Sequence, residues 1–142
     1  MLVQLIYASR VGADVDNLAV RDILRRSQAN NHRLGITGAL CFSGSFFLQC
    51  LEGERGAVNR LYNRILGDPR HRDCQLLSFA ELVARDFVSW DMGYVALSAE
   101  NRALFLRHSA SADFDPETMS AASVRALFAA LVERANWLRA EA

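Results

Sequence analysis

The sequence predicts an α+β fold in which the strands of one sheet alternate with two helices. Two observations support this class. Apolar segments rich in β-forming residues alternate with segments whose apolar residues recur at helical spacing. The chain has 142 residues, 51% of them hydrophobic, which is enough to form a real core. Sixteen basic residues balance sixteen acidic ones, so the net charge favours neither nucleic acid nor a membrane surface as a partner.

The first 97 residues contain seven predicted elements. Residues 2–9 predict a strand, and Asp14 or Asp16 can cap a helix that runs to about Asn31. Ser43-Gly44-Ser45 separates two apolar runs and predicts a hairpin. The remaining elements are a helix over 54–67, which Gly67 and Pro69 can end, and strands over 74–83 and 89–98.

This order, β-α-β-β-α-β-β, predicts a ferredoxin-like sheet with both helices on one face. In that topology the first and third strands are neighbours at the centre of the sheet. Tyr7 and Gln49 are therefore expected on adjacent strands.

The composition changes after residue 98, so the chain is divided into 1–97 and a helical extension over 98–142. Residues 99–108 predict a short helix, and Asp115 followed by Pro116 predicts the start of a longer one. Its apolar stripe is Val124, Leu127, Phe128, Leu131, Val132, Ala135 and Leu138. This helix is expected to cover the open face of the sheet, or else to contact a second subunit or another protein.

Gln49, in the apolar segment FFLQCLEG over 46–53, is a residue that a plain core does not explain. Alternation along a strand puts it on the same face as Phe47 and Leu51. A polar group buried there without partners costs about 1–3 kcal/mol. Gln49 therefore needs hydrogen-bond partners, unless its strand lies at an edge and the amide faces water.

Tyr7 and the first helix raise the same question. The Tyr7 hydroxyl needs a partner if the side chain is buried. The inward stripe of the helix begins apolar and ends polar: Val20, Ile23, Leu24, Ser27, Asn30 and Asn31. The two asparagines either end the helix, since Asn favours C-caps, or face a flat polar ligand between the helices.

A basic turn, Arg70-His71-Arg72, follows the second helix. It is either solvated or a clamp for a phosphate or carbonyl group. The three histidines are scattered and the cysteines lie in strands, so no metal site is expected. Cys41, Cys50 and Cys74 form no C-x-x-C pair, and no signal peptide is found, which indicates buried thiols in the reducing cytoplasm.

Six segments together resemble the BLUF family, the blue-light sensors that use FAD. Within residues 1–97 they are YAS at 7–9, SQANN at 27–31, ITGALCF at 36–42, FFLQCLEG at 46–53, DPRHR at 68–72 and WDMGY at 90–94. The short chain, with only a helical tail after the sensor, is similar to the stand-alone members of the family.

The resemblance implies that a flavin ring lies between the two helices. It implies that Gln49 bonds both Tyr7 and the flavin, and that Asn31, with Asn30 beside it, bonds a polar edge of the ring. The other residues implied at the site are Ile23, Ser27, Phe47, Ile65, Arg70 and His71, with Trp90 and Met92 competing for the place next to Gln49. FAD is the implied cofactor, and FMN or riboflavin would make similar ring contacts.

The resemblance also implies a mechanism. After the flavin absorbs blue light, Tyr7 gives up an electron and then a proton, and both return. What remains is a Gln49 amide that is rotated or tautomerised and makes a new bond toward flavin O4, which shifts the absorption to the red. The last strand and the C-terminal helices then pass the change to a separate protein in trans, or through formation of a homo-oligomer.

Two other functions fit the sequence less well. Catalytic motifs such as G-x-S-x-G are missing, so no enzyme activity is expected. A hydrolase of the acylphosphatase type would use Arg10 and an asparagine, but SRVGAD lacks the glycine-rich phosphate cradle. A flavin-free interaction module is the other alternative, and the presence together of Tyr7, Asn31 and Gln49 argues against it.

Overall fold

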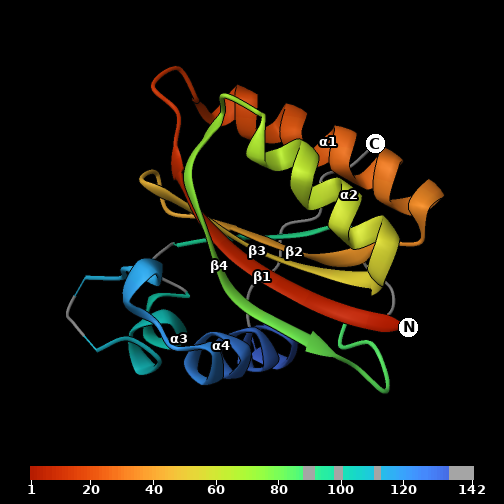
Figure 1. The fold of residues 1–142 in the computed structure, drawn as a ribbon. Coiled ribbons are helices and arrows are strands. Elements are labelled where there is room, and N and C mark those ends of the chain that lie inside the picture. Colours follow the sequence, from red (N-terminus) through yellow and green to blue (C-terminus); the bar gives the residue numbers. More distant parts are fainter. Residues whose placement is uncertain (88–91, 98–100, 111–112, 135–142) are drawn as a thin grey trace.

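The computed structural model describes residues 1–87, 92–97, 101–110 and 113–134, and it contains one five-stranded sheet in the order β4-β1-β3-β2-β5. The elements are β1 (Leu2–Val11), α1 (Asn17–Leu34), β2 (Thr37–Phe42), β3 (Phe46–Glu54), α2 (Arg55–Leu66), β4 (His71–Glu81), β5 (Gly93–Ala96), α3 (Arg102–Arg107), the 3-10 turn η1 (Pro116–Thr118) and α4 (Ala121–Arg134). Helices α1 and α2 lie on one face of the sheet, and α3 and α4 lie on the other (Figure 1). The predicted ferredoxin-like class is confirmed.

Strands β1 and β3 are antiparallel neighbours at the centre of the sheet, and Tyr7 lies directly opposite Gln49 in their register. The prediction that these two residues lie on adjacent strands is therefore confirmed. The alternative of an edge strand is wrong, because β3 is paired with β1 on one side and with β2 on the other.

Helix α1 is longer than predicted. Asp16 caps its start, with Oδ1 accepting a hydrogen bond of 2.8 Å from the Ala19 amide. Its end is set by Gly35, whose φ of 70° is the left-handed conformation that glycine adopts at low cost. The interpretation of Asn30 and Asn31 as residues that end the helix is therefore wrong, and both lie within it.

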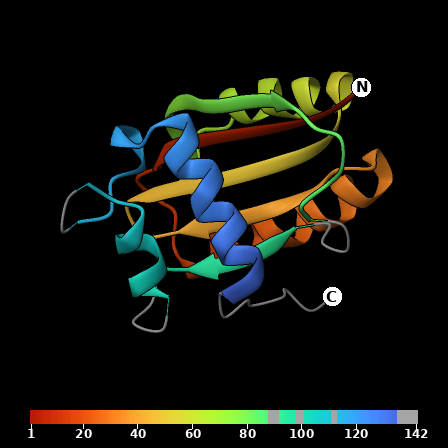
Figure 2. The same ribbon diagram turned by 90° about the horizontal axis from the view of Figure 1, so that it is seen from below.

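Helix α4 crosses the open face of the sheet, as predicted (Figure 2). Its start differs from the prediction, because Asp115 caps η1 and the chain at Met119 is extended before α4 begins. Ser120 Oγ instead accepts from the Ser123 amide at 3.0 Å in the first turn of α4. Ala135 and Leu138, two members of the predicted stripe, lie outside the described residues, as do Trp90 and its neighbours over 88–91.

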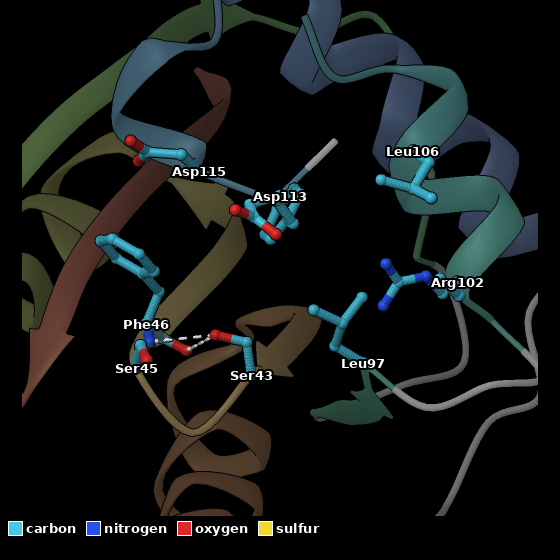
Figure 3. Close-up of a pocket in the computed structure, with 9 residues that line it drawn as sticks. Ser43, Ser45, Phe46, Leu97, Arg102, Leu106, Asp113 and Asp115 are labelled. Carbon is cyan, nitrogen blue, oxygen red and sulfur yellow. Dashed lines mark hydrogen bonds between the residues drawn. The ribbon is translucent and has the colours of Figure 1, made fainter. Parts of the chain in front are cut away.

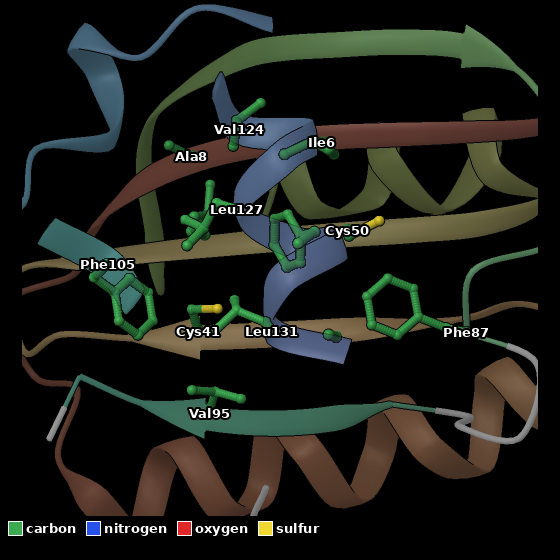
Figure 4. Close-up of a cluster of buried hydrophobic side chains, with 13 residues drawn as sticks. Ile6, Ala8, Cys41, Cys50, Phe87, Val95, Phe105, Val124, Leu127 and Leu131 are labelled. Atoms are coloured by element: carbon green, nitrogen blue, oxygen red, sulfur yellow. The ribbon is translucent and has the colours of Figure 1, made fainter. Parts of the chain in front are cut away.

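Two hydrophobic clusters lie on the two faces of the sheet. The cluster beneath α4 includes Ile6, Ala8, Cys50, Phe87, Val124, Leu127, Phe128 and Leu131 (Figure 4). Because side chains alternate along a strand, Tyr7 faces α1 and α2 while its neighbour Ile6 faces α4. A change on the face covered by α1 and α2 therefore lies one residue along the strand from side chains that contact the cluster beneath α4. None of the described helices is long and apolar enough to cross a membrane.

Candidate functional site

A pocket of about 240 Å³ lies between α1 and α2, with Gln49 of the central strand β3 in its lining. The residues predicted for the ligand that line it are Ile23, Ser27, Asn30, Asn31, Gln49, Ile65, Arg70 and His71. Sequence reasoning missed four others: Arg26, Leu61, Arg64 and Asp68. Leu61 belongs to the apolar stripe of α2 and could have been assigned from that spacing, whereas exposed arginines at a helix surface give no such signal.

Gln49 is hydrogen-bonded between Tyr7 and Met92. Tyr7 Oη donates to Gln49 Oε1, and Gln49 Nε2 donates to Met92 Sδ over 3.4 Å. All three side chains are buried. The Met92 carbonyl also accepts a hydrogen bond of 3.0 Å from Gln28 Nε2, which ties the start of β5 to α1. Trp90, the predicted competitor of Met92 for the place next to Gln49, lies outside the described residues.

Burial raises the pKa of Tyr7 well above its ordinary value, and the nearby Cys74 and Tyr62 groups act in the same direction. The Tyr62 ring lies 5.3 Å from the Tyr7 ring, measured between centroids. Tyr7 Oη therefore keeps its proton at neutral pH and acts as a fixed donor to Gln49.

The two asparagines of α1 have different surroundings. Asn31 is buried, with 1% of its surface exposed, whereas Asn30 is exposed and its Oδ1 accepts from Arg33 at 3.5 Å. The polar part of the inward stripe therefore consists of Ser27 and Asn31, with Asn30 at the rim of the pocket.

Only part of the predicted basic turn is a turn: His71 and Arg72 are the first residues of β4, and Arg70 precedes the strand. Arg70 makes three hydrogen bonds to the Asp68 carboxylate, two from Nε at 3.1 Å and one from Nη2 at 2.7 Å, and its Nη1 lies 3.6 Å from Asp22 Oδ2. The hydrogen bonds from Arg70 lower the pKa of Asp68. Arg72 is exposed and donates to the Val11 carbonyl, so only Arg70 and His71 of this turn belong to the pocket.

His71 is buried beside β1 and β3. Its Nδ1 shares a hydrogen bond of 2.8 Å with Ser9 Oγ, and its ring lies 4.6 Å from the Phe47 ring. Phe47, predicted to line the pocket, instead packs against this ring and does not line it. Ser9 was missed as a site residue, although it lies on the same face of β1 as Tyr7.

The protonation of His71 predicts a pH dependence of stability. Burial lowers the pKa of His71 from 6.5 to about 4. Because the unfolded chain binds this proton more readily than the folded one, stability is lost as the pH falls below about 6.5. Between pH 7 and pH 5 we expect a loss of about 2 kcal/mol that the variant His71→Gln does not show. Urea unfolding of both proteins at the two pH values measures it, and an equal loss in the two proteins would contradict this assignment.

Arg10 lies on the opposite side of the sheet from the asparagines. Its Nε is 3.1 Å from Glu117 Oε1, and its guanidinium lies 5.1 Å from the centre of the Phe46 ring. The arrangement expected for an acylphosphatase-type hydrolase is therefore not formed. Among the described residues, no cluster of three or more histidine, cysteine or acidic side chains is suitable for a metal ion.

A second hollow, of about 400 Å³, lies between the β2–β3 turn, the end of β5 and α3 (Figure 3). Its charged side chains are Arg102, Asp113 and Asp115. None of the residues predicted for the ligand lines it, so the pocket between α1 and α2 is the one that matches the sequence prediction.

A known family matches most of the chain. The family model described as "BLUF: Sensors of blue-light using FAD" matches residues 2–93. The chain is 36% identical over 88 residues to the photoactivated adenylate cyclase subunit beta of Euglena gracilis, covering 62% of this chain and 10% of that protein. It is 37% identical over 71 residues to the blue light- and temperature-regulated antirepressor BluF of Escherichia coli K12, covering 50% of this chain and 18% of that protein. The chain thus spans between a tenth and a fifth of the length of these relatives.

A solved structure matches almost the whole chain. The photo-activated state of BlsA superposes with a TM-score of 0.88 at 30% sequence identity, covering 98% of this chain and 99% of that one. The similarity therefore includes the C-terminal helices as well as the sheet.

Proposed function

The chain belongs to the BLUF family, the sensors of blue light using FAD, and on this premise we propose that it is a blue-light receptor whose switch is formed by Tyr7, Gln49 and Met92. The observation that supports this switch is the continuous hydrogen-bonded chain from Tyr7 Oη through the Gln49 amide to Met92 Sδ, with Gln49 at the pocket wall. The FAD-binding residues and the direction of signalling below are part of the same proposal.

The pocket between α1 and α2 fits a flat ring with polar edges. Its volume, about 240 Å³, is below the ~300–1,000 Å³ of pockets that enclose a whole small molecule, which suits a ring inserted with its tail outside. Ile23, Leu61 and Ile65 offer apolar contacts to the ring faces. Asn31 and Gln49 offer amide donors and acceptors to its edges. Arg70 and His71 also line the pocket. When bound, FAD supplies the absorption of blue light and the transient acceptor for an electron.

Gln49 is suited to keep a changed hydrogen-bond pattern after the light is absorbed, because its amide has one donor end and one acceptor end. In the structure the acceptor end faces Tyr7 and the donor end faces Met92. After rotation or tautomerisation the two ends exchange roles, Tyr7 Oη must reorient, and Met92 Sδ loses its donor. A carboxylate could not donate, and an alkyl side chain could do neither.

The signal is proposed to leave through Met92 and the cluster beneath α4. Met92 precedes β5, and Cys50, next to Gln49 in β3, belongs to the cluster with Leu127 and Phe128 of α4. A coupling of about 1–3 kcal/mol between the switch and α4 would be enough for signalling. The names of the two curated relatives, a cyclase subunit and an antirepressor, support a sensor that regulates an effector, and we propose that here the effector is a separate protein in trans.

We propose that this chain, as a sensor, carries no enzyme activity of its own. The free cysteines Cys41, Cys50 and Cys74 support a reducing compartment, so the proposed location is the cytoplasm.

Asn31 is the residue proposed to hold the ring edge, and Asn30 beside it is the matched control. Asn31→Ala is expected to weaken FAD binding about tenfold, because it removes a buried hydrogen bond to the ring. Asn30→Ala is expected to change the affinity less than about threefold, because Asn30 is exposed. Fluorescence titration of the flavin-free proteins with FAD measures both constants. A larger loss for Asn30→Ala would reverse the assignment.

The proposed function as a whole is tested by illumination. The purified protein loaded with FAD should show a flavin spectrum that shifts roughly ten nanometres to the red under blue light and relaxes in darkness, as expected for a stronger hydrogen bond to the ring. A colourless protein that takes up no added FAD would contradict the proposal and would favour the flavin-free interaction module.

A further inference from the structure

The connection between β4 and β5 must cross the whole end of the sheet, because these two strands form its opposite edges (Figure 2). We call residues 82–87 the crossing segment. It leaves β4 with a hydrogen bond of 2.9 Å from the Leu82 amide to the Leu2 carbonyl at the start of β1. Its residues 85–87 then bond side chains or backbone of β1, β2 and β3, and Met92 follows five residues after its end.

Glu52, near the end of β3, holds the last two residues of the crossing segment. Its side chain is fully buried, and its Oε1 accepts hydrogen bonds of 2.9 Å from the backbone amides of Asp86 and Phe87. Its Oε2 accepts a hydrogen bond of 2.8 Å from Gln4 Nε2 of β1. A carboxylate is an acceptor at both oxygens, so it satisfies three donors that a neutral amide cannot satisfy together.

Arg85 fixes the crossing segment to β2 and to the end of α1. Its Nη1 donates to Thr37 Oγ1 at 3.0 Å and to the Glu52 carbonyl at 3.2 Å, and its Nη2 donates to the Gly35 carbonyl at 2.7 Å. Gly35 is the cap of α1, and its amide bonds back to the Asn31 carbonyl. Arg85 therefore joins the crossing segment to the end of the helix that carries Asn31.

The two anchors connect to the proposed switch through different elements, Glu52 through β3 and Arg85 through the cap of α1. Glu52 is three residues from Gln49 on the same strand, and the segment that it holds leads to Met92, the partner of Gln49. Phe87, held by Glu52, is itself buried in the cluster beneath α4 (Figure 4). Its ring centroid lies 6.1 Å from that of Phe128. By alternation along β3, the Glu52 side chain lies on the α4 face of the sheet, opposite to the Gln49 amide, so the anchor connects the crossing segment to the cluster beneath α4.

We propose that Glu52 and Arg85 are positioning residues of the light switch: they hold the crossing segment so that Met92 stays against Gln49, and in this way they slow the return from the light-induced state to the dark state. This inference rests on the proposed function. The return requires the Gln49 amide to reverse its orientation, which Met92 hinders while it stays against Gln49. The described route to Met92 runs through α1, because Arg85 bonds the Gly35 cap of this helix and Gln28 of the same helix bonds the Met92 carbonyl.

The test is the rate of dark recovery after a blue-light pulse, measured by absorption on the FAD-loaded full chain. Glu52→Gln keeps the size of the side chain but places a donor against donors, and we expect it to speed recovery about tenfold, as for the loss of one hydrogen bond to a charged group. The matched control Glu81→Gln changes an exposed carboxylate at the end of β4 and should recover at the parent rate. Recovery of Glu52→Gln at the parent rate would overturn the inference.

A second comparison separates positioning from general loss of stability. Val20→Ala truncates a buried side chain of α1 that lines neither the pocket nor the crossing segment, and it should lower the midpoint of urea unfolding without changing recovery. Equal acceleration in Val20→Ala and Glu52→Gln would overturn the inference. If Glu52→Gln does not fold, Thr37→Val removes one acceptor of Arg85 at almost constant volume and should speed recovery in the same direction; an unchanged rate would count against the anchor.

The behaviour of the parent protein distinguishes failure of the proposed function from failure of the role proposed for Glu52 and Arg85. A parent that binds FAD but shows no light-induced shift would contradict the proposed function, and the inference would fail with it. A parent that shifts and recovers, together with variants that recover at its rate, would leave the proposed function in place and overturn only the role of Glu52 and Arg85.

Discussion

Replacement of Gln49 by leucine is expected to abolish the light-induced red shift completely while the flavin stays bound. Leucine fills a similar volume but can neither accept from Tyr7 nor donate to Met92, so no second hydrogen-bonded arrangement exists to be populated. Loss of one hydrogen bond to the ring lowers the affinity only by about 1 kcal/mol, which leaves the protein yellow at micromolar concentration. Absorption spectra in the dark and under blue light measure the effect. The control is Gln75→Leu on the exposed side of β4, which should shift like the parent.

The same result is expected for Tyr7→Phe, because phenylalanine keeps the buried ring but removes the hydroxyl proton that Gln49 Oε1 accepts. Tyr62→Phe is its matched control, since Tyr62 packs against Tyr7 and is less buried. A red shift of normal size in either Gln49→Leu or Tyr7→Phe would show that the switch does not depend on this pair.

A large loss of stability is expected for Phe128→Ala in α4. The Phe128 ring is 1% exposed and lies in the cluster beneath α4, so its removal leaves a cavity against Phe87 and should cost about 3–5 kcal/mol. Arg125→Ala, an exposed change on the same helix, should cost less than about 0.5 kcal/mol. Urea unfolding of the parent and both variants measures the two values.

The outcome bears on the division of the chain at residue 97. A loss of this size would mean that α4 is part of the core that the sensor needs in order to fold, although its composition differs from that of residues 1–97. A loss below about 1 kcal/mol would indicate that α4 docks weakly and separately from the sheet.

The pairing of Tyr7 with Gln49 could be predicted because it depends on strand order, and strand order follows from the sequence of element types. The burial of Gln49 could likewise be predicted from the apolar residues on its face. Both signals are repeated over many residues, so errors of several positions in the strand ends, such as the start of β4 at His71 instead of residue 74, did not affect them.

Other features depend on single contacts that leave no periodic signal. Gly35, rather than Asn31, ends α1. The end depends on one residue in the left-handed conformation, and the apolar spacing of the helix does not show where that residue lies. Phe47 packs on His71 instead of lining the pocket, which depends on a side-chain orientation and not on the face of the strand. Glu52 looks like the polar end of a strand in the sequence, and only the crossing of the chain from β4 to β5 buries it.

Light is expected to change the hydrogen bonding of the Gln49 side chain, and nuclear magnetic resonance of glutamine-labelled protein measures this change at the side chain itself. The chain contains four glutamines, Gln4, Gln28, Gln49 and Gln75, so the side-chain amide signals of ¹⁵N-labelled glutamine can be resolved, and the pair missing in Gln49→Leu identifies Gln49. We expect this pair to move under blue light and to return in darkness at the same rate as the absorption. An absorption shift during which the Gln49 signals stay in place would contradict the account.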